Sequence, residues 1–451
     1  MTPAARLSAA IEILGAIDAQ RIPAPNALKE WGTAHRFAGS GDRAAIAGLV
    51  FDVLRRRDSS AWLMDAGTPR ARLLGMLKLE RGLDVDAVAA LCDGGRFAPE
   101  PLTDLERAAF TSRSLKDAPA HIAGDYPEWL DPQLAAVFGD ARAEEAVAMA
   151  SRAPLDLRVN TLKAKHEKVL ASMKHLGAKA TPWSPWGLRI DLGADARNPG
   201  IHSEEAFIKG GVEVQDEGSQ LAAFLTGAKP GEQVIDMCAG AGGKTLALAA
   251  MMQGKGRLVA TDHDKRQLAP IHERLSRAGI HNADVRTPRG PDDTLSDIKA
   301  SADLVVIDAP CTGTGTWRRN PDAKWRMRPG ALEVRTKDQI AVLDRAAGLV
   351  KPGGRIAYIT CSVLPQENNE QVRGFTNRHP DYTVVPPTQV ASVLWDKADD
   401  FTAATLQSPE GLLMTPRRTG TDGFFEQTDD ITITIIFVEA TSTRHYWQLL
   451  D

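Results

Sequence analysis

Cysteine is scarce in this sequence of 451 residues, and this scarcity argues against both a disulfide framework and a zinc site. The four cysteines are Cys92, Cys238, Cys311 and Cys361, and no two of them form a C-x-x-C pair. A disulfide framework and a zinc site both need more closely grouped thiols. We therefore expect free thiols, no metal site and a cytoplasmic protein.

Long apolar runs and a strong excess of one charge are also missing. No stretch is long and apolar enough to span a bilayer. The first residues, MTPAARLSAAIEILGAID, carry acids within their apolar pattern, which is more typical of a helix than of a secretory signal. The formal net charge is −4. We expect no membrane partner, and a nucleic-acid surface would have to be a local basic patch.

The hydrophobic pattern predicts a helical domain followed by a small connector. Residues 1–140 carry apolar residues at three- and four-residue steps, which is typical of helices. One of these helices is predicted over RAAIAGLVFDVLRRR, with Asp42 as its N-cap. Residues 141–210 alternate strand, helix and strand, which predicts an α+β connector.

In residues 211–451, short apolar strands alternate with helices. The strand-like segments are QVIDMCAG, RLVATD, ADLVVIDAP and RIAYITC. This alternation predicts an α/β domain with a mostly parallel sheet and helices on both faces. Ligands of such folds bind at the carboxyl ends of the strands. The rule places five residues at one rim of the sheet: Cys238, Asp262, Asp308, Cys311 and Cys361.

A glycine-rich turn, CAGAGGK, joins the first of these strands to the next helix. Glycine lets the backbone approach a ligand closely. The turn differs by one residue from both a phosphate loop and a dinucleotide fingerprint. Together with Asp262 after the second strand, it suits a nucleoside cofactor without a pyrophosphate, and we predict S-adenosylmethionine (SAM). The alternative is a tight turn without a ligand, with Asp262 as a helix cap.

Cys311 and Cys361 each follow a strand, so their sulfurs face one cleft if those strands are neighbours. A lone cysteine is most often a buried, unreactive thiol, but two thiols beside a methyl donor have a chemical use. A thiolate that adds to carbon 6 of a pyrimidine makes carbon 5 nucleophilic. A carboxyl such as Asp308 can polarise the ring, and a base must then remove the carbon-5 proton so that the sulfur can leave.

Five motifs together resemble the Sun family of RNA cytosine-5 methyltransferases: DMCAGAGGKT, IDAPCTGTG, RRNPDAKW, TCSVLPQENNE and TDGFF. The resemblance runs from about residue 205 to 427 and is nearest to the RsmB-like small-subunit (16S) rRNA enzymes. The helical start is similar to the NusB-like RNA-binding domain of those enzymes. The resemblance implies a Rossmann-like SAM-dependent catalytic domain.

The resemblance also implies roles for individual residues. Cys361 would be the nucleophile, Cys311 the thiol that assists product release, and Asp308 would lie between cofactor and base. The residues implied to hold the cofactor are Cys238, Ala239, Gly240, Ala241, Gly242, Gly243, Lys244, Asp262 and Asp308.

The sequence departs from the family pattern in two places. Gly240 and Ala241 stand where the family usually has Ala and Pro, and this change keeps the critical glycines. Arg289 stands where the family usually has an aspartate that reaches the adenine. Either Asp292 or Asp293 substitutes for it, or adenine is recognised differently.

A basic stretch, TGTWRRNPDAKWRMRPG, lies between the two thiol motifs and contains two tryptophans. Basic residues contact phosphates, and aromatic rings stack on unpaired bases. We therefore predict RNA contacts at Arg318, Arg319, Lys324 and Arg326. The alternative is a solvated basic loop whose tryptophans dock in the core.

These observations predict a monomeric SAM-dependent RNA cytosine-C5 methyltransferase that acts on small-subunit rRNA. A tRNA methyltransferase is the first alternative, because the catalytic motifs do not choose the RNA. A non-catalytic RNA-binding assembly factor is the second. Arg289 favours that alternative, whereas the presence of both Cys311 and Cys361 opposes it.

Overall fold

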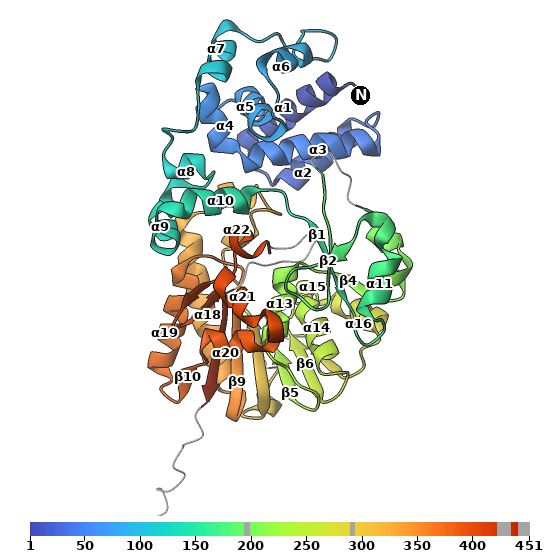
Figure 1. Cartoon of the computed structure of the whole chain (residues 1–451), viewed down its shortest axis with the longest axis vertical. Helices are drawn as coiled ribbons and strands as arrows, with labels where there is room; N and C mark the ends of the chain where they lie inside the picture. The colour runs from blue at the N-terminus through green and yellow to red at the C-terminus, as the bar shows by residue number, and fades with distance from the viewer. Residues whose placement is uncertain (194–198, 289–293, 422–433, 441–451) are drawn as a thin grey trace, which may run out of the picture. The chain divides into compact units, whose positions relative to one another are not determined.

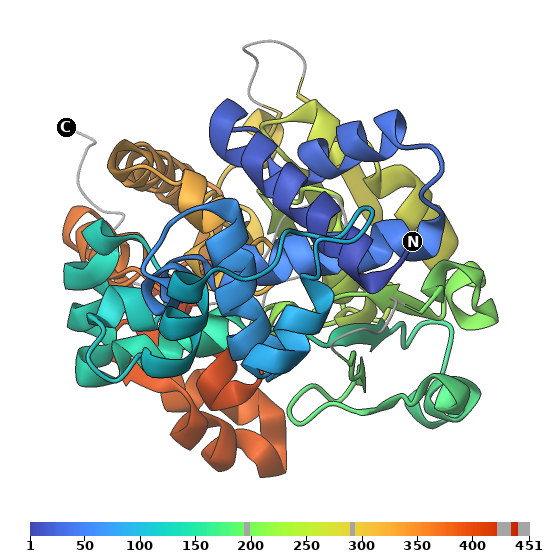
Figure 2. The same cartoon turned by 90° about the horizontal axis from the view of Figure 1, so that it is seen from above.

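The computed structural model describes residues 1–193, 199–288, 294–421 and, for its backbone, 434–440. The chain forms two compact units (Figures 1 and 2). Of the described residues, the helical unit contains Met1–Arg152, 192–193 and Trp317–Arg328, and the catalytic unit contains Ala153–Asp191, 199–316 and those from Pro329 onward. The helical part therefore extends past residue 140, and it includes a segment that the sequence had suggested for the catalytic domain.

The first helices of the helical unit have clear start signals. The Thr2 hydroxyl accepts a hydrogen bond from the Ala5 amide at 3.1 Å, and a proline follows it at the first helical position. Asp42 is not an N-cap as predicted, because the helix begins at Ser40 and Gly39 precedes it. The Asp42 carboxylate instead accepts from the Met1 amino group at 3.1 Å. The helices are α1 (Pro3–Gln20), α2 (Ala24–Ala34), α3 (Ser40–Arg55), α4 (Arg57–Met64), α5 (Pro69–Arg81), α6 (Val85–Leu91), α7 (Asp104–Ser112), α8 (Ala120–Ala123), α9 (Asp131–Phe138), α10 (Arg142–Ala150) and, within the inserted segment, α17 (Ala323–Arg326).

The connector is a four-stranded antiparallel sheet within the catalytic unit, in the order β2-β3-β1-β4. A buried ion pair fastens it to the next helix. Arg189 donates to both oxygens of Asp156 at 2.7 Å, and Asp156 also accepts from the amide of Glu217 at 3.1 Å. The elements are β1 (Leu155–Val159), α11 (His166–Ser172), β2 (Lys179–Ala180), β3 (Gly187–Ile190), α12 (Glu205–Ile208), β4 (Val212–Val214) and α13 (Glu217–Leu225).

The catalytic sheet has five parallel strands in the order β9-β8-β5-β6-β7, as predicted for a Rossmann-like methyltransferase. A sixth strand, β13, pairs antiparallel with β9. The main strands are β5 (Gln233–Asp236), β6 (Arg257–Thr261), β7 (Ala283–Arg286), β8 (Ala302–Asp308), β9 (Val350–Thr360) and β13 (Thr434–Ala440). Short strands β10 (Tyr382–Val384), β11 (Leu406–Ser408) and β12 (Gly411–Leu413) extend the sheet.

Successive residues of a strand point to opposite faces, and two hydrophobic cores follow from this alternation. Val234 packs in one core, with α13, α14 (Gly243–Met251) and α16 (Ile271–Ala278). Ile235 packs in the other core, with α18 (Pro329–Ala347) and α19 (Asn369–Arg378), which lie together in Figure 1. The remaining helices are α15 (Lys265–Leu268), α20 (Pro387–Ala391), α21 (Ala398–Ala404) and α22 (Pro416–Thr419). In the described ranges, no helix is long and apolar enough to cross a membrane.

Candidate active site

The glycine-rich turn between β5 and α14 has two glycines that are required for different reasons. Gly242 has φ +87°, and a Cβ built there would lie 2.5 Å from Ile271 Cγ1, so only glycine fits. Gly240 has φ +49°, but no described atom outside its immediate neighbours lies within 4 Å of a Cβ built on it. Gly242 is needed by the fold, whereas Gly240 keeps the rim open for a ligand.

Asp262 follows β6 and holds this turn. One carboxylate oxygen accepts from the Gly240 amide at 2.9 Å, and the other accepts from the Asp264 amide at 2.9 Å. The acid is therefore fixed at the open part of the turn, with lone pairs left to accept from ribose hydroxyls. The open cradle at Gly240 and the fixed acid beside it fit a nucleoside cofactor such as SAM.

Lys244 and Asp308 form an ion pair across the rim. Lys244 Nζ lies 2.6 Å from Asp308 Oδ2, and both side chains are largely shielded from solvent. This contact joins the glycine-rich turn to the end of β8. It brings the predicted cofactor residues next to the strand that leads to Cys311.

Asp236, at the end of β5, is a buried acid that sequence reasoning missed, although it lies in the DMCAGAGGKT motif. Its Oδ2 accepts from the Thr245 hydroxyl at 2.7 Å, and its Oδ1 has no hydrogen-bond partner among the described residues. Burial, and the nearby carboxylates of Asp308 and Asp262, raise the pKa of Asp236 to about 7.

Cys238, in the glycine-rich turn, has a thiol with a raised pKa. Burial and the negative charges of three nearby carboxylates raise the pKa of its thiol well above the ordinary value. A protonated thiol is a poor nucleophile. The raised pKa disfavours Cys238 as a nucleophile.

The two other rim thiols meet, as expected if β8 and β9 are neighbours. These strands pair in parallel, with Asp308 opposite Ile359. Cys311 Sγ lies 2.9 Å from Cys361 Sγ, and the Cys361 amide donates to Cys311 Sγ at 3.3 Å. Both cysteines are free and only partly buried. The geometry places the two sulfurs side by side, while the roles of the two thiols stay predictions.

The basic stretch from Trp317 to Arg328 belongs to the helical unit, and its central lysine is buried there. Lys324 Nζ donates to the carbonyl oxygens of Arg55 at 3.1 Å and Asp125 at 2.6 Å. Burial lowers the pKa of Lys324 to about 7. With 0% of its surface exposed, Lys324 has no face for a phosphate, which speaks against its predicted RNA contact.

The tryptophans of this stretch are packed as the alternative interpretation expected. Trp317 is 1% exposed, and Trp325 Nε1 donates to the carbonyl of Leu54 at 2.7 Å. Arg318 is also buried. Arg319 is partly exposed and Arg326 is exposed, so these two residues keep the prediction of RNA contacts.

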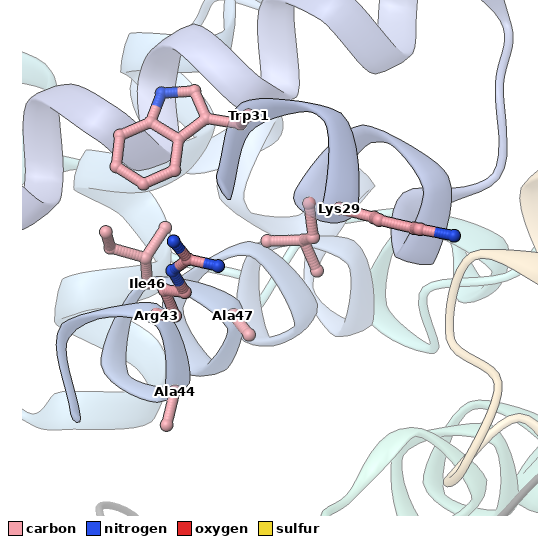
Figure 3. Close-up of a pocket in the computed structure, with 7 residues that line it drawn as sticks. Lys29, Trp31, Arg43, Ala44, Ile46 and Ala47 are labelled. Atoms are coloured by element: carbon pink, nitrogen blue, oxygen red, sulfur yellow. The ribbon is translucent and has the colours of Figure 1, made fainter. Parts of the chain in front are cut away.

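A pocket of about 340 Å³ in the helical unit involves none of the predicted site residues (Figure 3). Trp31, which lines this pocket, already has partners of its own. Its Nε1 donates to Glu12 at 3.1 Å, and its ring stacks on the His35 ring with the centroids 4.2 Å apart. The lining residues are Leu28, Lys29, Trp31, Arg43, Ala44, Ile46 and Ala47. The candidate site is therefore the rim of the catalytic sheet.

Arg289, Asp292 and Asp293, considered above for adenine recognition, lie outside the described residues.

Comparison with known proteins identifies relatives of one enzyme family. Residues 223–428 match a family model described as 16S rRNA methyltransferase RsmB/F, and residues 126–197 match the ferredoxin-like domain of such enzymes. A probable ribosomal RNA small subunit methyltransferase B from Synechocystis is 32% identical over 316 residues, which are 68% of this chain and 69% of that protein. The chain belongs to the RsmB/F family. Its members are SAM-dependent rRNA methyltransferases, which confirms the predicted enzyme class and cofactor.

A second relative is similar to this chain in sequence, and two solved structures are similar to it in fold. A probable methyltransferase B from Bacillus subtilis is 32% identical over 66% of this chain and 65% of that protein. The chain thus spans about two thirds of the length of these relatives. The crystal structure of PH0851 matches with a TM-score of 0.67 and 25% identity, over 97% of this chain and 99% of that one. NSun6 from Pyrococcus horikoshii shares the fold, with a TM-score of 0.57 and 19% identity over 70% of this chain and 99% of that one.

Proposed function

We propose that this member of the RsmB/F family methylates carbon 5 of a cytosine in small-subunit rRNA through a covalent adduct on Cys361. The observation that carries the proposal is the contact between the Cys311 and Cys361 sulfurs at the carboxyl ends of two adjacent strands. Methylation of an exocyclic nitrogen or a ribose hydroxyl would need no thiol. Two sulfurs at the methyl-donor rim suit a ring carbon, which needs covalent activation.

The proposed reaction begins with addition of a thiolate to the cytosine ring and ends with its release. The Cys361 thiolate adds to carbon 6, and the electrons of the ring double bond move to carbon 5. SAM, when bound, would supply a methyl group from its positively charged sulfur. Carbon 5 gains this methyl, and the sulfur keeps the electron pair of the broken bond and leaves as a neutral thioether. A base then removes the carbon-5 proton, the ring double bond forms again, and the bond between carbon 6 and sulfur breaks. Cys311, next to Cys361, is the residue that we assign to this release.

Neighbouring residues have supporting roles in this proposal. Asp308 can accept a hydrogen bond from the exocyclic amino group of the base, and its ion pair with Lys244 fixes the carboxylate. Asp262 would accept from the ribose hydroxyls of the cofactor. A cytosine inside a duplex could not reach the thiols, so we expect a single-stranded or flipped-out target.

The test is to trap the adduct. The protein is incubated with SAM and rRNA containing 5-fluorocytosine, whose fluorine cannot leave as a proton does, and denaturation-resistant complexes are measured. We expect a complex with the wild type and with Cys311→Ala, and none with Cys361→Ala. Loss only in Cys311→Ala would reverse the two roles. If the wild type forms no complex with rRNA, a matched tRNA substrate tests the first alternative, and failure on both would contradict the proposed chemistry.

A further inference from the structure

The loop that carries Cys311 has little backbone support of its own. The amide of Ala309 donates to the carbonyl of Ile359 at 2.8 Å, and beyond this point the chain leaves the sheet. Residues 309–313 belong to no helix or strand. On the other side of the loop, the Gly315 amide donates to the carbonyl of Cys361 at 3.0 Å. Between these two backbone contacts, the peptide groups next to Cys311 are held by side chains that reach the loop from elsewhere.

Two buried side chains hold the peptide groups on both sides of Cys311. Gln339 Nε2, from the middle of α18, donates to the carbonyl of Pro310 at 2.9 Å. Glu367 Oε1 accepts from the Thr312 amide at 2.8 Å, and its other oxygen accepts from the Thr312 hydroxyl. Both side chains are 0% exposed. We call Gln339 and Glu367 the Cys311 clamp.

The clamp is itself cross-linked in a single orientation. Gln339 Nε2 also donates to Glu367 Oε1 at 3.1 Å, so one amide nitrogen serves two acceptors. Gln339 Oε1 has no hydrogen-bond partner among the described residues. Reversing the amide would place its oxygen against two other oxygens, so only the observed orientation satisfies the contacts.

The turn that carries Glu367 also holds the Cys361 end of β9. Tyr358 donates from its hydroxyl to the carbonyl of Glu367 at 2.8 Å. Asn368, the next residue, donates to the carbonyl of Ser362 at 2.9 Å and accepts from the Thr360 hydroxyl at 2.6 Å. A single buried turn therefore positions both strand ends from which the two sulfurs project.

We propose that Gln339 and Glu367 are positioning residues that keep Cys311 beside Cys361 for release of the methylated base. This inference rests on the proposed function. The clamp contacts the peptide groups flanking Cys311 and no reacting atom, so it acts through the loop. Loss of the clamp should impair the step that needs Cys311 and spare the addition step, which needs Cys361.

The test separates formation of the adduct from its release. Glu367→Gln and Gln339→Leu weaken the clamp, and Thr312→Val removes only the hydroxyl contact in case the buried variants fold poorly. Gln220→Leu is the matched control, because Gln220 is a buried amide on α13 that donates to the carbonyl of Gln215 at 2.8 Å and contacts neither the Cys311 loop nor the turn that carries Glu367. Complexes are measured on 5-fluorocytosine RNA and on ordinary RNA.

On ordinary RNA we expect the clamp variants, like Cys311→Ala, to accumulate at least about tenfold more denaturation-resistant complex than the wild type or Gln220→Leu, a shift on the scale of ~1.4 kcal/mol. Their rate of complex formation on 5-fluorocytosine RNA should stay within about threefold of the wild-type rate. Equal slowing of both steps, or wild-type release, would overturn the inference and leave the proposed function intact. A wild type that forms no complex would instead overturn the proposed function.

A second readout needs no RNA. Alkylation of each thiol by iodoacetamide is followed by mass spectrometry in the wild type, Thr312→Val and Glu367→Gln. We expect the ratio of Cys311 to Cys361 alkylation to change several-fold in the clamp variants and to be unchanged in Gln220→Leu, which is measured beside them. An unchanged ratio in the clamp variants would show that they do not position Cys311.

Discussion

Two glycines of the rim, Gly240 and Gly242, should separate stability from cofactor affinity. An alanine with positive φ costs about 1–2 kcal/mol. At Gly242 the new methyl also lies 2.5 Å from Ile271 Cγ1, and such overpacking adds about 1–3 kcal/mol. Gly242→Ala should therefore lower the free energy of unfolding by about 2–5 kcal/mol, and Gly240→Ala by only about 1–2 kcal/mol.

For cofactor binding, we expect Gly240→Ala to have the larger effect of the two substitutions. The space that a methyl at Gly240 would enter is the open cradle beside Asp262, so Gly240→Ala should weaken SAM binding at least about tenfold, or ~1.4 kcal/mol. Gly231→Ala is the control, because Gly231 has φ +91° and an equally open Cβ position before β5, at the opposite end of that strand. Denaturant unfolding and calorimetric titration measure the two effects. Wild-type SAM affinity in Gly240→Ala, or a larger stability loss there than in Gly242→Ala, would refute the reasoning.

Two further predictions concern buried charged groups. The raised pKa of Asp236, about 7 against 3.8, stabilises the fold most below pH 4, and this stability is lost as the pH rises through 7. The unfolding free energy of the wild type minus that of Asp236→Asn should therefore fall by up to about 4 kcal/mol between pH 4 and 8, and a flat difference would contradict the burial argument. Lys324→Ala should lower the free energy of unfolding, measured in urea, by about 2 kcal/mol or more, because two buried carbonyls lose a donor. Arg326→Ala should change this free energy by no more than about 0.5 kcal/mol and should reduce the salt dependence of RNA binding. The opposite pattern would make Lys324 the RNA contact.

The rim of the catalytic sheet could be predicted from the sequence because one topological rule determines it. Strands alternating with helices imply a parallel sheet, and the residues after each strand then gather at one edge. Cys311 and Cys361 are 50 residues apart in the sequence, yet their sulfurs lie 2.9 Å apart. The connector was predicted for a similar reason, since its strands and helix have distinct hydrophobic periods.

The parts that could not be predicted depend on tertiary burial. Lys324 and Trp325 have the composition of an RNA-binding loop, and no local signal shows that the lysine donates to carbonyls of the helical unit. Asp236 and Glu367 lie in motifs that were recognised. Their roles became visible only through their partners, because the same acids at the surface would have ordinary pKa values and no fixed contacts.

The last prediction concerns the inserted segment Trp317–Arg328. Lys324 donates to the backbone carbonyls of Arg55 and Asp125, and Trp325 donates to the carbonyl of Leu54 and packs against the helical core. This segment therefore needs residues 1–152 to complete its packing. A fragment of residues 153–451 would carry the catalytic residues, but it would leave Trp317 and Trp325 without those partners. Exposed aromatic surface of this kind promotes association.

We therefore expect the fragment to show red-shifted tryptophan fluorescence and concentration-dependent association, measured by fluorescence and analytical ultracentrifugation. The same fragment with Trp317→Ser and Trp325→Ser is the control, and it should associate less. A fragment that is monomeric with wild-type fluorescence would show that the segment packs without the helical unit. The helical unit would then be dispensable for the chain that follows Cys311, and its contacts with Lys324 would serve stability alone.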